Sequence, residues 1–278
     1  MRIARQRGFL ARGFALVLML CGGVAHAQRV QGNMELQWGD PRGGPGQPKR
    51  PAKFNATLVT DDGSRHVLDA DQARRAAGDL YALSSRRVAV QFSPAKRAGG
   101  LRSIEAIVPV EPLRTTASAR VMSMAKAVTG NTRWVTLACK FSDIATEQKP
   151  VTFFQDQYGI APGQLGHYWQ EVSYGKIDLT GSTAHGWFTL PQPRSYYIKT
   201  VDGEDDADLD LLFEDCAAAA DPTVNFAGVK GINMMFNGDL DGSAWGGSAC
   251  GILDGSNKCI RNTWNPPWSF NNLAPLSH

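Results

Sequence analysis

The sequence predicts an α/β (α+β) protein in which a small β-rich segment precedes a larger domain of alternating strands and helices. In the first half, apolar residues alternate with polar ones between turn dipeptides, which is typical of strands. From residue 131 onward, short apolar runs alternate with segments whose apolar residues recur at helical spacing, which favours a layer of strands and helices. With 278 residues, 43% of them apolar, the chain is long enough for a large domain and a smaller one.

Residues 1–27 have the pattern of a secretory signal peptide. Arginines precede a short apolar run over 14–20, and Ala25-His26-Ala27 supplies a small-residue cleavage site. The run is too short to span a bilayer, and the bulky Leu20 before Cys21 disfavours a lipoprotein site. We therefore expect a secreted or periplasmic protein with no membrane association once the signal is removed.

Charge is divided unevenly between the two halves. Residues 28–130 contain 16 basic and 9 acidic residues, a net of +7, whereas residues 131–278 contain 9 basic and 17 acidic residues, a net of −8. The chain without its signal is close to neutral, so a chain-wide basic field for nucleic acid is absent. Either the halves are independent solvated surfaces, or the basic segment contacts the acidic domain within the molecule.

Within residues 28–130 we expect a lead-in, a small β-rich unit that resembles a prosegment, and a linker. Residues 28–52 are basic and rich in Gly and Pro, which predicts a poorly ordered lead-in. Residues 112–130 are expected to be the linker. The expected elements are strands over 54–58, 87–92 and 103–108 and a helix over 71–80, capped by Asp69 or Asp71.

The domain expected over residues 131–278 alternates strands and helices. The expected elements are strands over 134–141, 176–180, 185–190 and 231–236 and helices over 150–158, 162–172 and 205–220. Acidic residues in the first turns of the last helix complement its macrodipole. Beyond residue 236 the chain is rich in Gly, Trp and Pro, and we assign no further strand or helix there.

Four cysteines remain after signal removal, an even number that suits an oxidising compartment. Three pairings are possible. Cys250 and Cys259 flank the turn dipeptide Asp254-Gly255 and plausibly close one loop. Cys139 would then pair with Cys216 and tie a strand to a helix. A zinc site is the weaker interpretation, because no C-x-x-C spacing exists.

Two motifs carry a resemblance to a known family. They are Leu137-Ala138-Cys139-Lys140-Phe141-Ser142-Asp143 and Tyr168-Trp169-Gln170-Glu171-Val172-Ser173-Tyr174-Gly175-Lys176, followed by Trp187-Phe188-Thr189-Leu190-Pro191 and Tyr196-Tyr197. With these motifs, residues 134–278 resemble the secreted immune-inhibitor-A-like metalloproteases, a metzincin-like group of zinc peptidases. The resemblance implies a zincin-like N-terminal subdomain that hydrolyses peptide bonds in protein substrates.

The resemblance also implies where zinc would bind. In that family a helix carries H-E-x-x-H-x-x-G-x-x-H, in which three His bind zinc and the Glu acts on the attacking water. His278 then resembles the first zinc ligand; otherwise it is a solvated tail. The catalytic Glu and the other ligands are absent from this sequence, and the remaining histidines, His66, His167 and His185, form no i, i+4 pair. We expect a fragment of the peptidase that is itself inactive, because one imidazole cannot retain zinc.

Other patterns leave alternatives open. Eight acidic residues over 202–215 and alternating oxygen ligands over 237–242 could hold calcium, although a solvated helix face and a polar turn are simpler interpretations. The resemblance implies that the segment before the zinc helix supplies the edge strand that pairs with extended substrate. The alternative function is a non-catalytic secreted binding module that uses Trp245, Trp264 and Trp268 on polysaccharide or protein.

Overall fold

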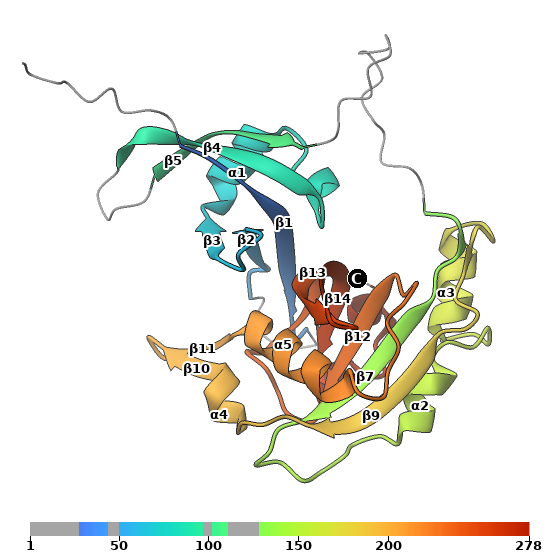
Figure 1. Cartoon of the computed structure of the whole chain (residues 1–278). Helices are drawn as coiled ribbons and strands as arrows, with labels where there is room; N and C mark the ends of the chain where they lie inside the picture. Colours follow the sequence, from blue (N-terminus) through green and yellow to red (C-terminus); the bar gives the residue numbers. More distant parts are fainter. Residues whose placement is uncertain (1–27, 44–49, 97–101, 111–127, 278) are drawn as a thin grey trace, which may run out of the picture.

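The computed structural model describes residues 28–43, 50–96, 102–110 and 128–277. The expected signal peptide, His278 and residues 112–127 of the expected linker lie outside these ranges. The fold is mixed α/β, as expected, with one large mixed sheet and a few helices on its faces (Figure 1). None of the described helices is long and apolar enough to cross a membrane.

The sheet contains ten strands and runs through both halves of the chain. Its main path is β3 (Arg65–Leu68), β2 (Lys53–Val59), β1 (Gln28–Pro41), β13 (Ser243–Leu253), β14 (Ser256–Asn265), β12 (Gly231–Phe236), β7 (Trp134–Lys140) and β9 (Thr183–Thr189). Strands β9, β7, β12 and β14 are parallel, whereas β13 is antiparallel to β14 and β1 is antiparallel to β13. Off this path, β4 (Arg87–Lys96) pairs with β1 and with β5 (Arg102–Pro109).

The β-rich unit closes around a core of its own. Met34 and Leu36 of β1 pack against Leu58 of β2 and Val88 of β4, under α1 (Ala70–Ala77) and the short 3-10 helix η1 (Tyr81–Leu83). Asp69 caps α1, since its carboxylate accepts a hydrogen bond from the Gln72 amide. The three strands and the helix expected in this half are therefore confirmed.

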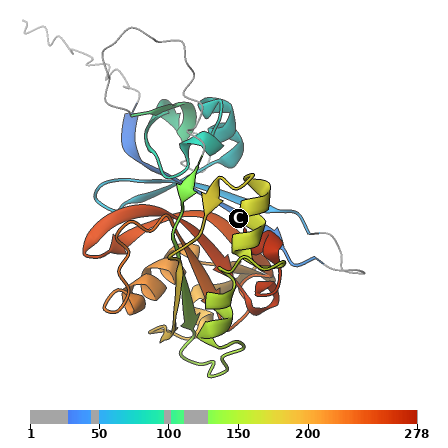
Figure 2. The same cartoon turned by 90° about the vertical axis from the view of Figure 1, so that its right-hand side faces the viewer.

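Helices cover both faces of the larger half of the sheet (Figure 2). On one face, α5 (Leu209–Ala220) packs Leu212 and Phe213 against β7 and β12. On the other face, Phe154, Leu165 and Leu276 form a second core. Its helices are α2 (Val151–Asp156), α3 (Leu165–Val172) and α6 (Leu273–Leu276), with the short 3-10 helix η2 (Pro267–Ser269) nearby.

Short elements complete the larger half. They are β6 (Gly130–Asn131), which pairs with β8 (Ile177–Asp178), and β10 (Ile198–Val201), which follows α4 (Arg194–Tyr197) and pairs with β11 (Glu204–Ala207). The expected helix over 205–220 was wrong in its first turn, because residues 204–207 belong to the β10–β11 hairpin. Asp202 and Gly203 have the left-handed conformation that a two-residue hairpin turn requires.

Two further expectations from sequence were wrong. Residues 28–41, expected to be poorly ordered, form β1, because Met34 and Leu36 alternate with Glu35 and fit a sheet with one apolar face. Residues 243–265, to which no element was assigned, form the β13–β14 hairpin around Asp254-Gly255. Glycines weaken the strand signal of this segment, and pairing with both neighbours compensates.

Both expected disulfides are confirmed. Cys139 of β7 is bonded to Cys216 of α5, with 5.9 Å between their Cα atoms, so a strand is tied to a helix. Cys250 and Cys259 lie opposite each other in the β13–β14 hairpin, with 4.0 Å between their Cα atoms.

Candidate functional site at the junction of β1 and β13

The outer edge of β13 is the place where the two halves of the chain meet. Residues 37–41 of β1 pair antiparallel with residues 247–243 of β13, in a register that sets Gln37 opposite Gly247 and Pro41 opposite Ser243. β1 thus fills the edge of β13 that β14 leaves open. An unfilled edge of this kind is where an extended peptide can add to a sheet.

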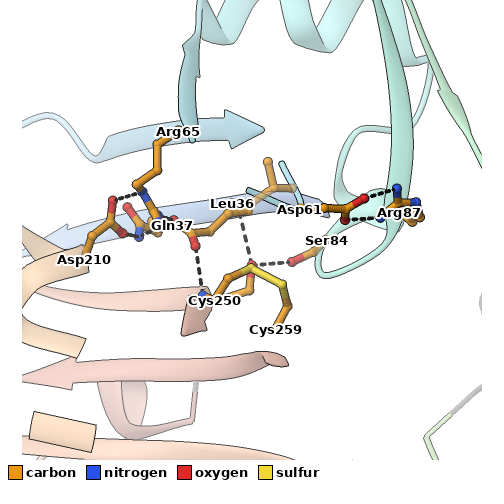
Figure 3. Close-up of a disulfide and its surroundings, with 11 residues drawn as sticks. Leu36, Gln37, Asp61, Arg65, Ser84, Arg87, Asp210, Cys250 and Cys259 are labelled. Atoms are coloured by element: carbon orange, nitrogen blue, oxygen red, sulfur yellow. Dashed lines mark hydrogen bonds and ion pairs between the residues drawn. A yellow bond between two sulfur atoms is a disulfide. The ribbon is translucent and has the colours of Figure 1, made fainter. Parts of the chain in front are cut away.

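Close approach at Gly247 makes this pairing tight. Gly247 has φ +151°, and a Cβ atom there would overlap the carbonyl oxygen of Leu36 in β1. One residue further, the Leu36 amide donates to the Ser248 hydroxyl oxygen at 3.2 Å, and the Ser84 hydroxyl lies 3.3 Å from the same oxygen (Figure 3). Only glycine allows the two backbones to come this close.

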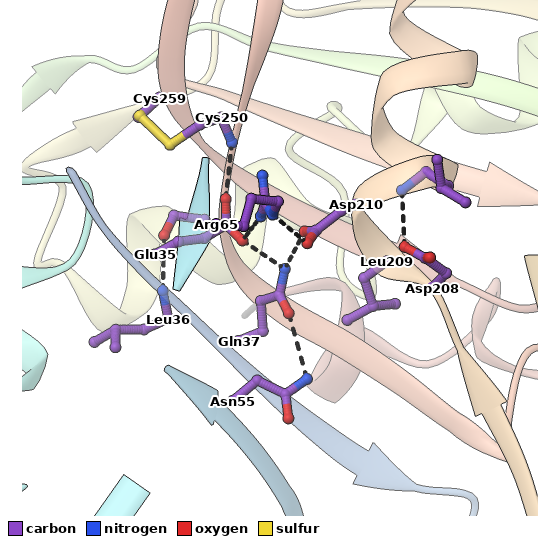
Figure 4. Close-up of polar contacts among 12 residues, drawn as sticks. Glu35, Leu36, Gln37, Asn55, Arg65, Asp208, Leu209, Asp210, Cys250 and Cys259 are labelled. Atoms are coloured by element: carbon purple, nitrogen blue, oxygen red, sulfur yellow. Dashed lines mark hydrogen bonds and ion pairs between the residues drawn. A yellow bond between two sulfur atoms is a disulfide. The ribbon is translucent and has the colours of Figure 1, made fainter. Parts of the chain in front are cut away.

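A buried polar cluster lies beside this pairing, between β1, β3 and α5 (Figure 4). Arg65 donates to the carboxyl oxygen Oε1 of Glu35 and lies 2.6 Å from Oδ2 of Asp210. Gln37 donates to both carboxyl groups, at 3.2 Å and 3.1 Å. The second oxygen of Glu35 accepts the amide of Cys250 at 3.0 Å, so the cluster also reaches β13.

Burial controls the charge of this cluster. Glu35 is 1% exposed, and this desolvation, with the nearby charge of Asp210, raises its pKa to about 9, although Arg65 acts in the opposite direction. A pKa raised in this way favours the protonated form of Glu35. Within the cluster, Arg65 and Asp210 form the ion pair between β3 and α5.

A second ion pair crosses the same junction. Lys53 of β2 lies 2.5 Å from Asp241, whose side chain is fully buried and also accepts the indole N–H of Trp245 at 2.9 Å. Lys53 and Arg65 both belong to the basic half of the sequence, whereas Asp241 and Asp210 belong to the acidic half. Charges of opposite sign thus meet where the halves join.

The residues expected to carry chemistry lie apart from one another. His278 is outside the described residues, and His66, His167 and His185 lie on β3, α3 and β9. No three His, Cys, Asp or Glu side chains come together around a common point in the described ranges. These ranges by themselves do not fit a catalytic zinc ion, which needs three protein ligands.

The prediction that Trp245, Trp264 and Trp268 form a binding surface was wrong for two of the three. Trp245 and Trp264 are 2% and 0% exposed, because both pack in the core beneath α5. The Trp264 indole N–H donates to the carbonyl of Leu209, and that of Trp268 donates to the carboxylate of Asp239. Of the three, only Trp268 is half-exposed.

The segment over 237–242 uses its polar groups inside the protein. The Asn237 side chain accepts the amide of Phe141 at 2.9 Å and donates to the carbonyls of Ile144 and Thr146. Asp241 is engaged with Lys53 and Trp245. Calcium binding over 202–215 or 237–242 stays a prediction.

Neither a protein-family model nor a curated protein matches the chain.

Sequence reasoning missed the β1–β13 junction. The alternation from Met34 to Trp38 is a strand signal within residues 28–41, and it was masked by the Gly- and Pro-rich stretch that follows. A lone Glu between apolar neighbours gives no sign in sequence that it will be buried. Its partners Arg65 and Asp210 are 30 or more residues away.

Proposed function

We propose that residues 131–278 form the part of a secreted zinc metallopeptidase that precedes its zinc-binding helix. The intact enzyme would hydrolyse peptide bonds in proteins, with zinc supplying Lewis-acid chemistry. The observation that carries the proposal is β13, an antiparallel strand that follows four parallel strands in the sheet and precedes His278 in the chain. The family resemblance implies a substrate-pairing strand in this segment.

The position of α6 also supports the proposal. Asn272 caps α6, and Leu276 packs into the core between the sheet and α2 and α3. Leu276 and Ser277 line a small hollow with Tyr158 and Asn233 on the sheet face. The backbone that leads to His278 is therefore held against the sheet, in a place where the following residues could continue across the same face.

The nucleotides that follow the codon for His278 provide the test. We expect Glu directly after His278 and His three residues later, and we expect the extended protein to bind zinc and cleave casein in a chelator-sensitive way. The 278-residue chain alone is expected to show neither property, because its described residues supply no three-ligand site. A stop codon or a residue other than Glu after His278, or chelator-sensitive cleavage by the shorter chain, contradicts the proposal.

We further propose that the segment over 28–110 acts as a prosegment that covers β13. β1 occupies the strand edge that an extended substrate would need. Two ion pairs from the neighbouring strands, made by Lys53 of β2 and Arg65 of β3, hold the segment in this position. The segment contains no Cys, so a thiolate cannot block a zinc site. The segment must therefore block substrate binding through the pairing of β1 with β13.

Gly247→Ala is expected to loosen this cover. The added methyl group overlaps the Leu36 carbonyl in an unfavourable backbone conformation, with strain on the order of 1–3 kcal/mol. Hydrogen exchange at the amides of residues 37–40 should become faster. Gly203→Ala is the control, since Gly203 also has a positive φ but its Cβ would meet nothing within 4 Å. Equal exchange in both variants contradicts tight pairing at Gly247.

A further inference from the structure

Two adjoining hollows lie where β7 and β12 begin, beside residues 258–261 of β14. Their volumes are about 350 Å³ and about 450 Å³, and both are lined by Lys230 and Arg261. Trp134 lines the first hollow, and Lys258 lines the second. Among the residues that the structure describes, no acidic one lines either hollow.

The register of the sheet places an aromatic ring beside a cation. Gly231 of β12 lies opposite Trp134 on one side and opposite Arg261 on the other. A Cβ atom at Gly231 would collide with the Trp134 indole. The indole of Trp134 in β7 therefore lies over Gly231 in β12, the strand between β7 and β14. Because Gly231 has no side chain, the Trp134 indole can lie over it, on the strand that pairs with Arg261.

Lys230 and Arg261 have no acidic partner in the described part of the chain. Both Lys230 and Arg261 are exposed, and neither side chain makes a hydrogen bond or ion pair with another described residue. Residues 131–278 carry 9 basic and 17 acidic residues, so carboxylates are abundant in this half, yet none of the described ones lines either hollow. Arg133 and Lys258 lie nearby, bonded to the Ala227 carbonyl and to Asp254 respectively. Positive charge is concentrated at one end of an acidic domain, where it attracts anions.

We propose that these hollows bind an acidic polysaccharide, one whose sugars carry carboxylate or sulfate groups. The Trp134 indole offers an apolar plate for the C–H face of a sugar ring, while Lys230 and Arg261 bind the anionic substituents through charge-assisted hydrogen bonds. Two joined hollows suit a chain of sugars better than a single unit. Single-stranded nucleic acid fits less well, because its binding sites stack successive bases on several aromatic rings.

The site is independent of peptide hydrolysis, so it can be tested on the 278-residue chain. Binding of polygalacturonate and of dextran sulfate is measured by calorimetry at low ionic strength, with neutral dextran for comparison. The two polyanions separate carboxylate from sulfate recognition. The double variant Lys230→Gln, Arg261→Gln is expected to lose about tenfold or more in affinity, the size of effect expected for lost charge-assisted contacts.

A charge-matched control separates the site from general attraction. Arg75→Gln with Lys176→Gln removes two exposed cations elsewhere, and neither side chain makes a hydrogen bond or ion pair with a described residue. This control should change affinity less than twofold. Trp134→Leu, checked for folding by circular dichroism, should weaken binding of both polyanions. Equal losses in the two double variants, no binding of either polyanion, or tighter binding of poly-glutamate or single-stranded DNA would overturn the proposal.

Discussion

Between about pH 5 and 8, the unfolding free energy of the chain is expected to fall by about 1.4 kcal/mol per pH unit relative to the Glu35→Gln variant. The cause is the buried carboxyl group of Glu35, whose pKa is raised to about 9 by desolvation and by Asp210. An acid with a raised pKa takes up a proton on folding. Its contribution is therefore largest below the unfolded pKa near 4.5 and is lost as the pH rises through 9.

Glu35→Gln keeps the shape of the side chain and an oxygen for the Cys250 amide, but it cannot ionise. Urea unfolding of both proteins at several pH values measures the difference. Glu105→Gln on exposed β5 is the matched control, and its difference from the wild type should change little over the same range. A wild-type chain that becomes more stable than Glu35→Gln as the pH rises would show that Glu35 is ionised in the folded state.

Removal of the disulfide between Cys139 and Cys216 is expected to cost about 4.5 kcal/mol of unfolding free energy, because the bond closes a loop with a sequence separation of 77 residues. Both cysteines are fully buried between β7 and α5. The variant Cys139→Ala, Cys216→Ala therefore also loses packing in the main core. The unfolded chain gains freedom that the bond removes in the wild type.

The second disulfide provides an internal comparison. Cys250 and Cys259 are only 9 residues apart, so Cys250→Ala with Cys259→Ala should cost about 2.5 kcal/mol by the same relation. Chemical unfolding of the two double variants under identical conditions gives the order of the two effects. A larger loss for the shorter loop would mean that side-chain packing in the β13–β14 hairpin outweighs loop closure.

Local patterns were enough to predict much of the larger half. The apolar run over 134–140 and the helical spacing of Leu212, Phe213 and Cys216 each identify an element that then packs against the other. The turn at Asp254-Gly255 was visible in the sequence, although the strands on either side of it were not. Glycine-rich strands take their conformation from their neighbours, so their own composition indicates little.

The candidate sites depend on contacts that no local pattern encodes. The edge of β13 is covered because residues more than 200 positions earlier pair with it. Glu35 is buried with Arg65 and Asp210 only after β1, β3 and α5 come together. The sequence does not distinguish Trp245 and Trp264 from Trp134. In the structure the first two lie under α5, whereas Trp134 lines an open hollow.

By itself, the sequence determined the α/β class, the two disulfide pairs as the favoured pairing, and most helices and strands, because turn chemistry and apolar spacing act over a few residues. Tertiary structure alone decided that β1 joins the two halves into one sheet, which tryptophans are buried, and which charges lose water or stay unpaired. These outcomes depend on which segments meet in space, because a side chain loses water, and its pKa shifts, only after the segments around it have come together.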